Sequence, residues 1–116
     1  MAQNIVTMNL GEKRPIYGVV TATPNTTLVI SASPAPTYNL TNPAGSLVGG
    51  SPFAVTGYDA GEVPKARAWV NLDTTGFSLG VYKLAFIITV TGLDSMVRVF
   101  KPTVYIRVVP ENTLIS

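Results

Sequence analysis

The stretch GVYKLAFIITV, from residue 80 to residue 90, constrains the fold more than any other part of the chain. Successive side chains of a β-strand point to opposite faces, so residues two apart share a face. The apolar residues at every second position here are Tyr82, Leu84, Phe86, Ile88 and Val90. A strand of about ten residues is long enough to run the length of a small domain. This segment therefore predicts a sheet with one buried face.

Shorter segments elsewhere repeat the pattern, punctuated by nine prolines and ten glycines. Clean alternation favours half-buried strands, and frequent turn residues favour many of them. The side chains expected to face inward are Ile16, Gly18, Val20, Ala22, Leu28, Ile30, Ala32, Tyr38, Leu40, Ala66, Ala68, Val70 and Leu72. The strands expected before residue 80 are 5–10, 16–23, 27–33, 37–41, 46–48, 53–58 and 65–72. No segment has the period of a helix.

The end of the chain changes phase. Val97 and Val99 share one parity, whereas Val104, Ile106 and Val108 share the other. An inserted residue would keep both sets buried, so we predict a β-bulge or sheet switch at 101–102, after a turn at 92–95. In total, about seven to nine strands in 116 residues predict an all-β fold, a single antiparallel β-sandwich.

Composition excludes several kinds of chemistry. The chain has no Cys and no His, which removes thiolate chemistry, disulfides, the commonest metal ligands and the usual proton-transfer side chain. Eight basic and six acidic residues give a net charge of +2, and the basic residues form no block, so nucleic acid is not an expected partner. The longest apolar run, Leu84 to Ile88, is too short to span a bilayer, so no membrane is expected either. We expect no cofactor.

The surface is short of charge, with 12% charged residues against about 25% in an average soluble domain. Two readings stay open: part of the surface is hidden in an assembly, or a threonine-rich β-protein simply carries few charges. The first eight residues have neither a basic segment nor an apolar core, so we expect no secretory signal. We therefore expect the chain to be made in the cytoplasm.

Three segments carry a family resemblance. TYNLTNPAGSLV, from residue 37, and LGVYKLAF, from residue 79, resemble the strand-turn and penultimate-strand patterns of immunoglobulin-like β-sandwich modules, and PTVYIRVV, from residue 102, resembles their last strand. The resemblance covers roughly residues 14 to 110, without the cysteines of antibody-type domains. Short cysteine-free modules of this kind are similar to those of tailed-bacteriophage virions, as capsid decoration proteins or tail appendages. The resemblance to these virion proteins implies a structural role. The sandwich fold by itself does not, because one fold serves many functions.

Candidate catalytic groups are few. Asp59 and Glu62 share a loop and could form the carboxylate pair of a glycosidase. We expect instead that they cap turns or are solvated. The letters GFSLG, residues 76–80, fit a nucleophile elbow, yet no histidine exists to complete a triad. We therefore expect no enzyme activity.

Two groups on strands are candidates for partner binding. Lys65, Arg67 and Trp69 should lie opposite the alanines of their strand, as a binding hot spot or sugar-stacking platform. The alternative, which we favour, is that twist turns Trp69 inward or the loop 59–64 covers it. Tyr105 and Arg107 should form a second outward face. Edge strands and the N-terminal arm could also complete a neighbour's sheet.

These observations give one organisation: residues 1–13 as an N-terminal arm or first strand, 14–110 as an Ig-like β-sandwich, and 111–116 as a tail. The expected function is a non-catalytic virion module that decorates or cements the capsid, with a tail appendage or a carbohydrate-binding module as alternatives. The expected partner is a protein lattice, such as a major capsid or tail protein, and self-association is a further option.

Overall fold

The computed structural model describes residues 4–32, 34–49, 52–92 and 95–115, and these residues form an all-β fold of ten strands in two sheets. The prediction of an all-β chain is confirmed, with more strands than the seven to nine expected. Within the described ranges, no helix is long and apolar enough to cross a lipid bilayer. The strands are β1 Ile5–Asn9, β2 Lys13–Thr21, β3 Leu28–Ile30, β4 Thr37–Thr41, β5 Phe53–Ala54, β6 Gly57–Tyr58, β7 Lys65–Asp73, β8 Gly80–Gly92, β9 Val97–Phe100 and β10 Thr103–Val109.

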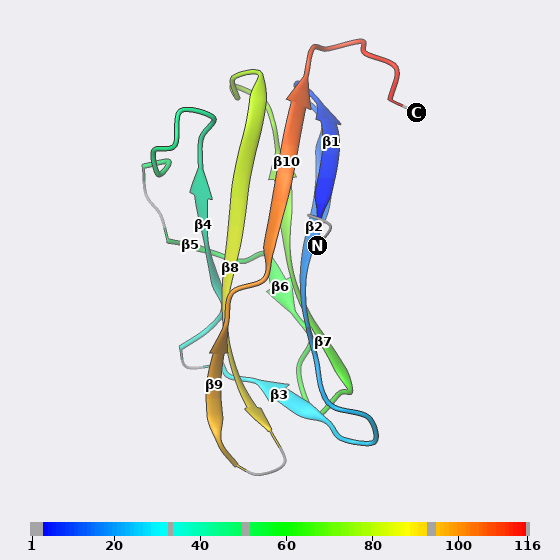
Figure 1. Ribbon diagram of the computed structural model, residues 1–116, viewed down its shortest axis with the longest axis vertical. Helices are drawn as coiled ribbons and strands as arrows, with labels where there is room; N and C mark the ends of the chain where they lie inside the picture. The colour runs from blue at the N-terminus through cyan, green and yellow to red at the C-terminus, as the bar shows by residue number, and fades with distance from the viewer. Residues whose placement is uncertain (1–3, 33, 50–51, 93–94, 116) are drawn as a thin grey trace.

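The larger sheet is built around β8. Its main order is β1-β10-β8-β4-β5, and both β3 and β9 add to the far end of β8. The smaller sheet has the order β2-β7-β6 and packs against it (Figure 1). The expectation of a purely antiparallel arrangement is wrong at one place, because β1 runs parallel to β10, with Ile5 opposite Tyr105 and Asn9 opposite Val109.

The core lies between the two sheets, and the predicted alternation places it correctly. All five alternating residues of β8 are buried, as are Ile16 and Val20 of β2 and every second residue of β7 from Ala66 to Leu72. Gly18 is needed where β2 crosses the ring of Phe86, since a Cβ there would lie 2.4 Å from Phe86 Cδ2. Burial of these side chains is the main stabilising contribution.

The predicted bulge or sheet switch at residues 101–102 is wrong, because β9 and β10 both pair with β8 in the larger sheet. Phe100 pairs with Ile88 and Thr103 pairs with Ala85, so each strand advances by three residues and none is inserted. The strand is interrupted at 101–102, where Pro102 cannot donate to a ladder, but the register is kept. Val97 and Val99 are consequently on the outer side and exposed. Residues 93 and 94 of the predicted turn lie outside the described residues.

Several short segments differ from expectation in extent. The strand expected at 27–33 is reduced to β3; Leu28 and Ile30 are buried as predicted, but Ala32, also expected to face inward, lies beyond the strand and is exposed. The strand expected at 46–48 forms a single bridge, between Leu47 and Thr41. The strand expected at 53–58 is split into β5 and β6, which belong to different sheets, so the chain crosses between the layers there.

Strand β3 links the two layers at the lower end of the molecule in Figure 1. Leu28 pairs with Gly92 of β8 and also exchanges backbone hydrogen bonds with Val63, N to O at 2.9 Å and 3.0 Å. Beyond this crossing, β9 and the end of β8 continue as a hairpin. The inner side of that hairpin is left uncovered by the smaller sheet, and this positions the main candidate site.

Candidate interaction surfaces

The first predicted group lies on the outer face of the smaller sheet. Lys65, Arg67 and Trp69 alternate with the buried alanines of β7, as expected. Trp69 is partly buried but not turned inward: its ring lies 6.2 Å from that of Tyr17 on β2 and against Gly57 on β6, where a Cβ would meet Cζ2 at 2.5 Å. The favoured interpretation, an inward or loop-covered Trp69, is therefore wrong.

Arg67 is held beside this aromatic pair by a carboxylate. Its Nε donates to Asp59 Oδ2 at 3.2 Å, and its guanidinium lies 5.5 Å from the centre of the Tyr17 ring. The Arg67 side chain lowers the pKa of Asp59, chiefly through this hydrogen bond. Tyr17 is 43% exposed. The arrangement is a small platform of one exposed ring, one half-buried indole and a fixed cation, which is the chemistry of a stacking surface.

The second predicted group lies on the opposite side of the molecule. Tyr105 and Arg107 are on the outer face of the larger sheet, paired with Lys83 and Val81 of β8 and with Ile5 and Thr7 of β1. Tyr105 is half-buried and Arg107 is exposed. The two predicted groups belong to different sheets and face away from each other, so the fold does not bring them together.

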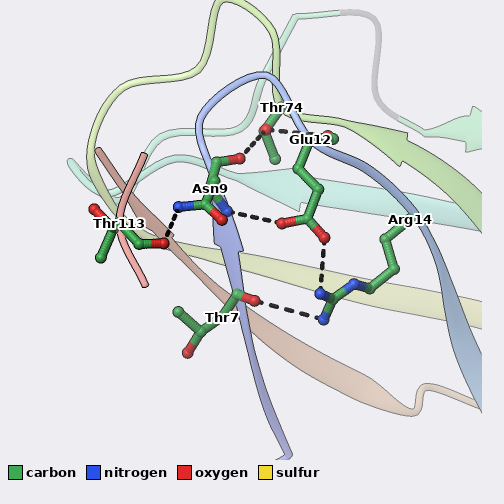
Figure 2. Close-up of polar contacts among 6 residues, drawn as sticks. All are labelled: Thr7, Asn9, Glu12, Arg14, Thr74 and Thr113. Carbon is green, nitrogen blue, oxygen red and sulfur yellow. Dashed lines mark hydrogen bonds and ion pairs between the residues drawn. The ribbon is translucent and has the colours of Figure 1, made fainter. Parts of the chain in front are cut away.

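A polar cluster at the corner between β1 and β2 is structural (Figure 2). Glu12 accepts from the Asn9 backbone N–H at 2.9 Å and pairs with Arg14 at 2.7 Å. The buried Thr74 hydroxyl donates to Asn9 O at 2.7 Å and lies 3.1 Å from Glu12 O, while Asn9 Nδ2 donates to Thr113 O at 2.9 Å. Each contact engages backbone or a neighbouring charge, so the cluster fixes the chain where it passes between sheets.

Acidic groups do not converge in the described residues. No group of three or more potential metal ligands occurs there. Asp59 is engaged by Arg67, Asp73 accepts from the Thr75 N–H at 2.9 Å and lies 3.8 Å from Lys13, and Glu12 belongs to the corner cluster. These carboxylates hold turns and strand ends in place.

The surface that the sequence interpretation missed is β9. Met96, Val97, Val99 and Phe100 are 57%, 64%, 55% and 41% exposed. The parity change between Val97 and Val104 was the available signal, but it predicts a bulge or sheet switch only if both sets of side chains are buried. It instead marks a strand whose apolar side chains are exposed.

A groove accompanies β9 on its inner side. It has a volume of about 510 Å³ and lies between the hairpin and the end of β2, with Val20, Ala22, Leu28 and Val90 on its walls and Arg98 and Phe100 on the hairpin side. A smaller hollow of about 360 Å³ adjoins it at Phe100 and is bordered by Lys101. Arg98 and Phe100 have the core-facing parity, but the smaller sheet does not reach them.

Comparisons with known proteins give little further information. No protein-family model and no curated protein matches the chain. One solved structure with some similarity is a family 123 glycoside hydrolase from Clostridium perfringens, from a study of glycolipid glycan hydrolysis. The match is 12% identical with a TM-score of 0.48, and it covers 93% of this chain and 23% of that enzyme. At this level the similarity carries no argument about activity.

Proposed function

We propose that this chain is a non-catalytic Ig-like β-sandwich module that binds another protein, and that it serves as a virion component decorating a phage capsid. The observation that carries the binding role is β9 together with the residue before it, because Met96, Val97, Val99 and Phe100 are all exposed at one end of the molecule. Apolar surface gathered in this way is typical of interaction sites. A tail appendage is a variant of the same role.

The sheet order supports the Ig-like part of the proposal. In constant-type Ig domains the second, fifth and fourth strands lie side by side in one sheet with the first strand at its edge, and the third, sixth and seventh form the other sheet. Strand β1 differs from this order, because it pairs with β10 of the larger sheet. Here β2-β7-β6 corresponds to the first set, and β4-β8-β10 to the second, with β5 at the edge beside β4. β3 and β9 are additions around the end of β8.

The test of the virion role is association with particles. The purified chain is mixed with capsids and, separately, with tails of its source virus prepared without it, and bound protein is measured by sedimentation. Saturable binding at a fixed number of copies per particle is expected, because a decorating protein occupies equivalent lattice sites. Absence of binding to both capsids and tails would rule out the virion role.

A carbohydrate-binding role is the second candidate, favoured by the Tyr17–Trp69 pair with Arg67 and Asp59 beside it. Only Tyr17 of this group presents a well-exposed ring, since Trp69, like Tyr58 and Tyr105, is half-buried. Titration with a panel of oligosaccharides, followed by tryptophan fluorescence, tests it. Quenching that is lost in Tyr17→Ala supports this role, and an unchanged spectrum with every sugar excludes it.

A further inference from the structure

The backbone of β9 presents hydrogen-bonding groups away from β8. The Phe86 N–H donates to Pro102 O at 2.9 Å, and the Gly92 N–H donates to Met96 O at 3.3 Å. In an antiparallel ladder, hydrogen-bonded pairs alternate with non-bonded pairs. Arg98 and Phe100 therefore direct their backbone groups to β8, whereas Val97 and Val99 direct theirs to the open side. No hydrogen bond of the described residues engages the N–H and C=O groups of Val97 and Val99.

The same row of groups is already used further along the sheet. β10 continues β9 in unbroken register, and its odd-numbered residues face β1: the Tyr105 N–H donates to Asn4 O at 2.8 Å, and Val109 O accepts from the Leu10 N–H at 2.9 Å. β1 begins at Ile5, opposite Tyr105. Strand addition thus occupies the β10 part of this edge and leaves the β9 part open among the described residues.

We propose that β9 is a docking strand, to which a partner protein adds an extended segment that continues the edge occupied by β1. This deepens the protein-binding role proposed above and rests on it. Main-chain bonds to Val97 and Val99 supply affinity, and every second side chain of the added segment points into the groove beside Phe100. The groove selects a large apolar side chain next to an acidic one.

The charge around the groove argues for this occupant. The charged residues that line the groove and the adjoining hollow are Arg98 and Lys101, both cations. Lys101 is exposed and forms no ion pair with a described residue, so it is placed to meet a carboxylate of the added segment. A second copy fits less well, because β9 has no carboxylate of its own that could meet Lys101 of the other copy.

The experiment uses the full chain and the acetylated, amidated peptide Thr-Val-Glu-Val-Phe-Val-Thr, whose glutamate and phenylalanine share a face. In the free protein, the amide protons of Val97 and Val99 are expected to exchange with solvent faster than those of Arg98 and Phe100. On peptide addition, Val97 and Val99 become protected and their amide resonances shift. A peptide with lysine in place of glutamate should bind about threefold more weakly, and Lys101→Glu should reverse this preference.

A proline substitution separates the backbone role from side-chain effects. Val99→Pro removes the outward N–H without removing a bond to β8, and we expect peptide affinity to fall about tenfold while the β8–β9 amides stay protected. Val99→Thr keeps the N–H and the branched shape, and should bind as the parent does. Equal binding by Val99→Pro overturns the proposal, as does protection of Val97 and Val99 in the free chain.

Three outcomes separate the partner segment from a second copy, and the docking strand from the virion role. Protection of Val97 and Val99 that grows with protein concentration would identify a second copy as the occupant and overturn the partner segment. If the parent and Val99→Pro sediment equally with particles, the docking strand is wrong and the virion role stands. If the peptide binds at β9 but particles do not bind, the docking strand stands and the virion role fails.

Discussion

Individual residues fix the distance between the two sheets and the path of the chain between them. Gly18 permits contact between the β2 backbone and Phe86. The alanines of β7 lie beside Gly18 on the buried face of the same sheet. Thr74 is fully buried, and its hydroxyl contacts two backbone carbonyls at the corner in Figure 2. The inward position of Gly18 follows from the alternation of its strand, whereas its close contact with Phe86 and the burial of Thr74 came from the tertiary structure.

Gly18→Ala is expected to lower the free energy of unfolding by about 1–3 kcal/mol, because the new methyl group overlaps Phe86. Gly49→Ala is the matched control: a Cβ there has no heavy atom within 4 Å, and its φ is outside the left-handed region. It should be neutral or slightly stabilising. Urea denaturation measures both variants, and equal stability of the two would contradict the close contact.

Thr74→Val is expected to cost about 1–3 kcal/mol, because the Asn9 and Glu12 carbonyls lose a donor inside the corner. Thr21→Val makes the same change at an exposed position of β2 and should stay within about 0.5 kcal/mol of the parent. Thermal unfolding followed by circular dichroism compares them. A Thr74→Val protein as stable as Thr21→Val would mean that the corner hydrogen bonds contribute nothing.

Among the elements, β8 and β9 show how far local pattern extends. Alternation in β8 placed its buried face correctly along the whole strand. The same rule failed at β9, where Val97 and Val99 are exposed although they are as apolar as the buried residues of β10. The candidate surface is therefore β9, a strand that is as apolar as the core strands but lies where the smaller sheet does not cover it.

A pair of Val→Thr changes tests this difference. Val97→Thr combined with Val99→Thr should change the free energy of unfolding by less than about 0.5 kcal/mol per substitution, since both side chains are in water already. Val104→Thr, on the buried face of β10, should cost about 1–3 kcal/mol because a hydroxyl enters the core. Similar losses at the two sites, measured by urea denaturation, would show that β9 is covered in solution.

At the scale of the whole molecule, the fold is elongated. Its principal extents are 47, 31 and 24 Å, and its radius of gyration is 15.2 Å, against about 13 Å for a compact domain of this length. The hairpin of β8 and β9 extends past the smaller sheet and contributes to this length (Figure 1). The exposed strand β9 lies at one end of this elongated fold (Figure 1).

Stability of the whole fold should fall in acid. Hydrogen bonds from Arg67 lower the pKa of Asp59, and hydrogen bonds from Thr75 lower that of Asp73, from an ordinary value of 3.8. A carboxylate with a lower pKa in the folded chain stabilises the fold above the unfolded value, and this contribution is lost as pH falls through the folded value. The loss should therefore occur below pH 3.8.

The measurement is the free energy of unfolding between about pH 5 and pH 2. Asp59→Asn combined with Asp73→Asn should flatten the decrease seen in the parent. Glu62→Gln, at an exposed carboxylate that forms no ion pair with a described residue, should leave the decrease as it is. An unaltered slope in the double variant would contradict the assigned hydrogen bonds.

Local pattern was enough to predict the all-β character, the buried face of each long strand and the shared face of Lys65, Arg67 and Trp69, but the tertiary structure was needed to place Trp69 on the outer side. These predictions follow from side chains two residues apart, and that information is local to each strand. Pairing partners are not local, which is why the parallel contact of β1 with β10 and the assignment of β5 and β6 to different sheets came from the tertiary structure. The exposure of β9 has the same origin. Alternation predicts which side chains share a face. Whether that face is covered depends on how far the opposite sheet extends.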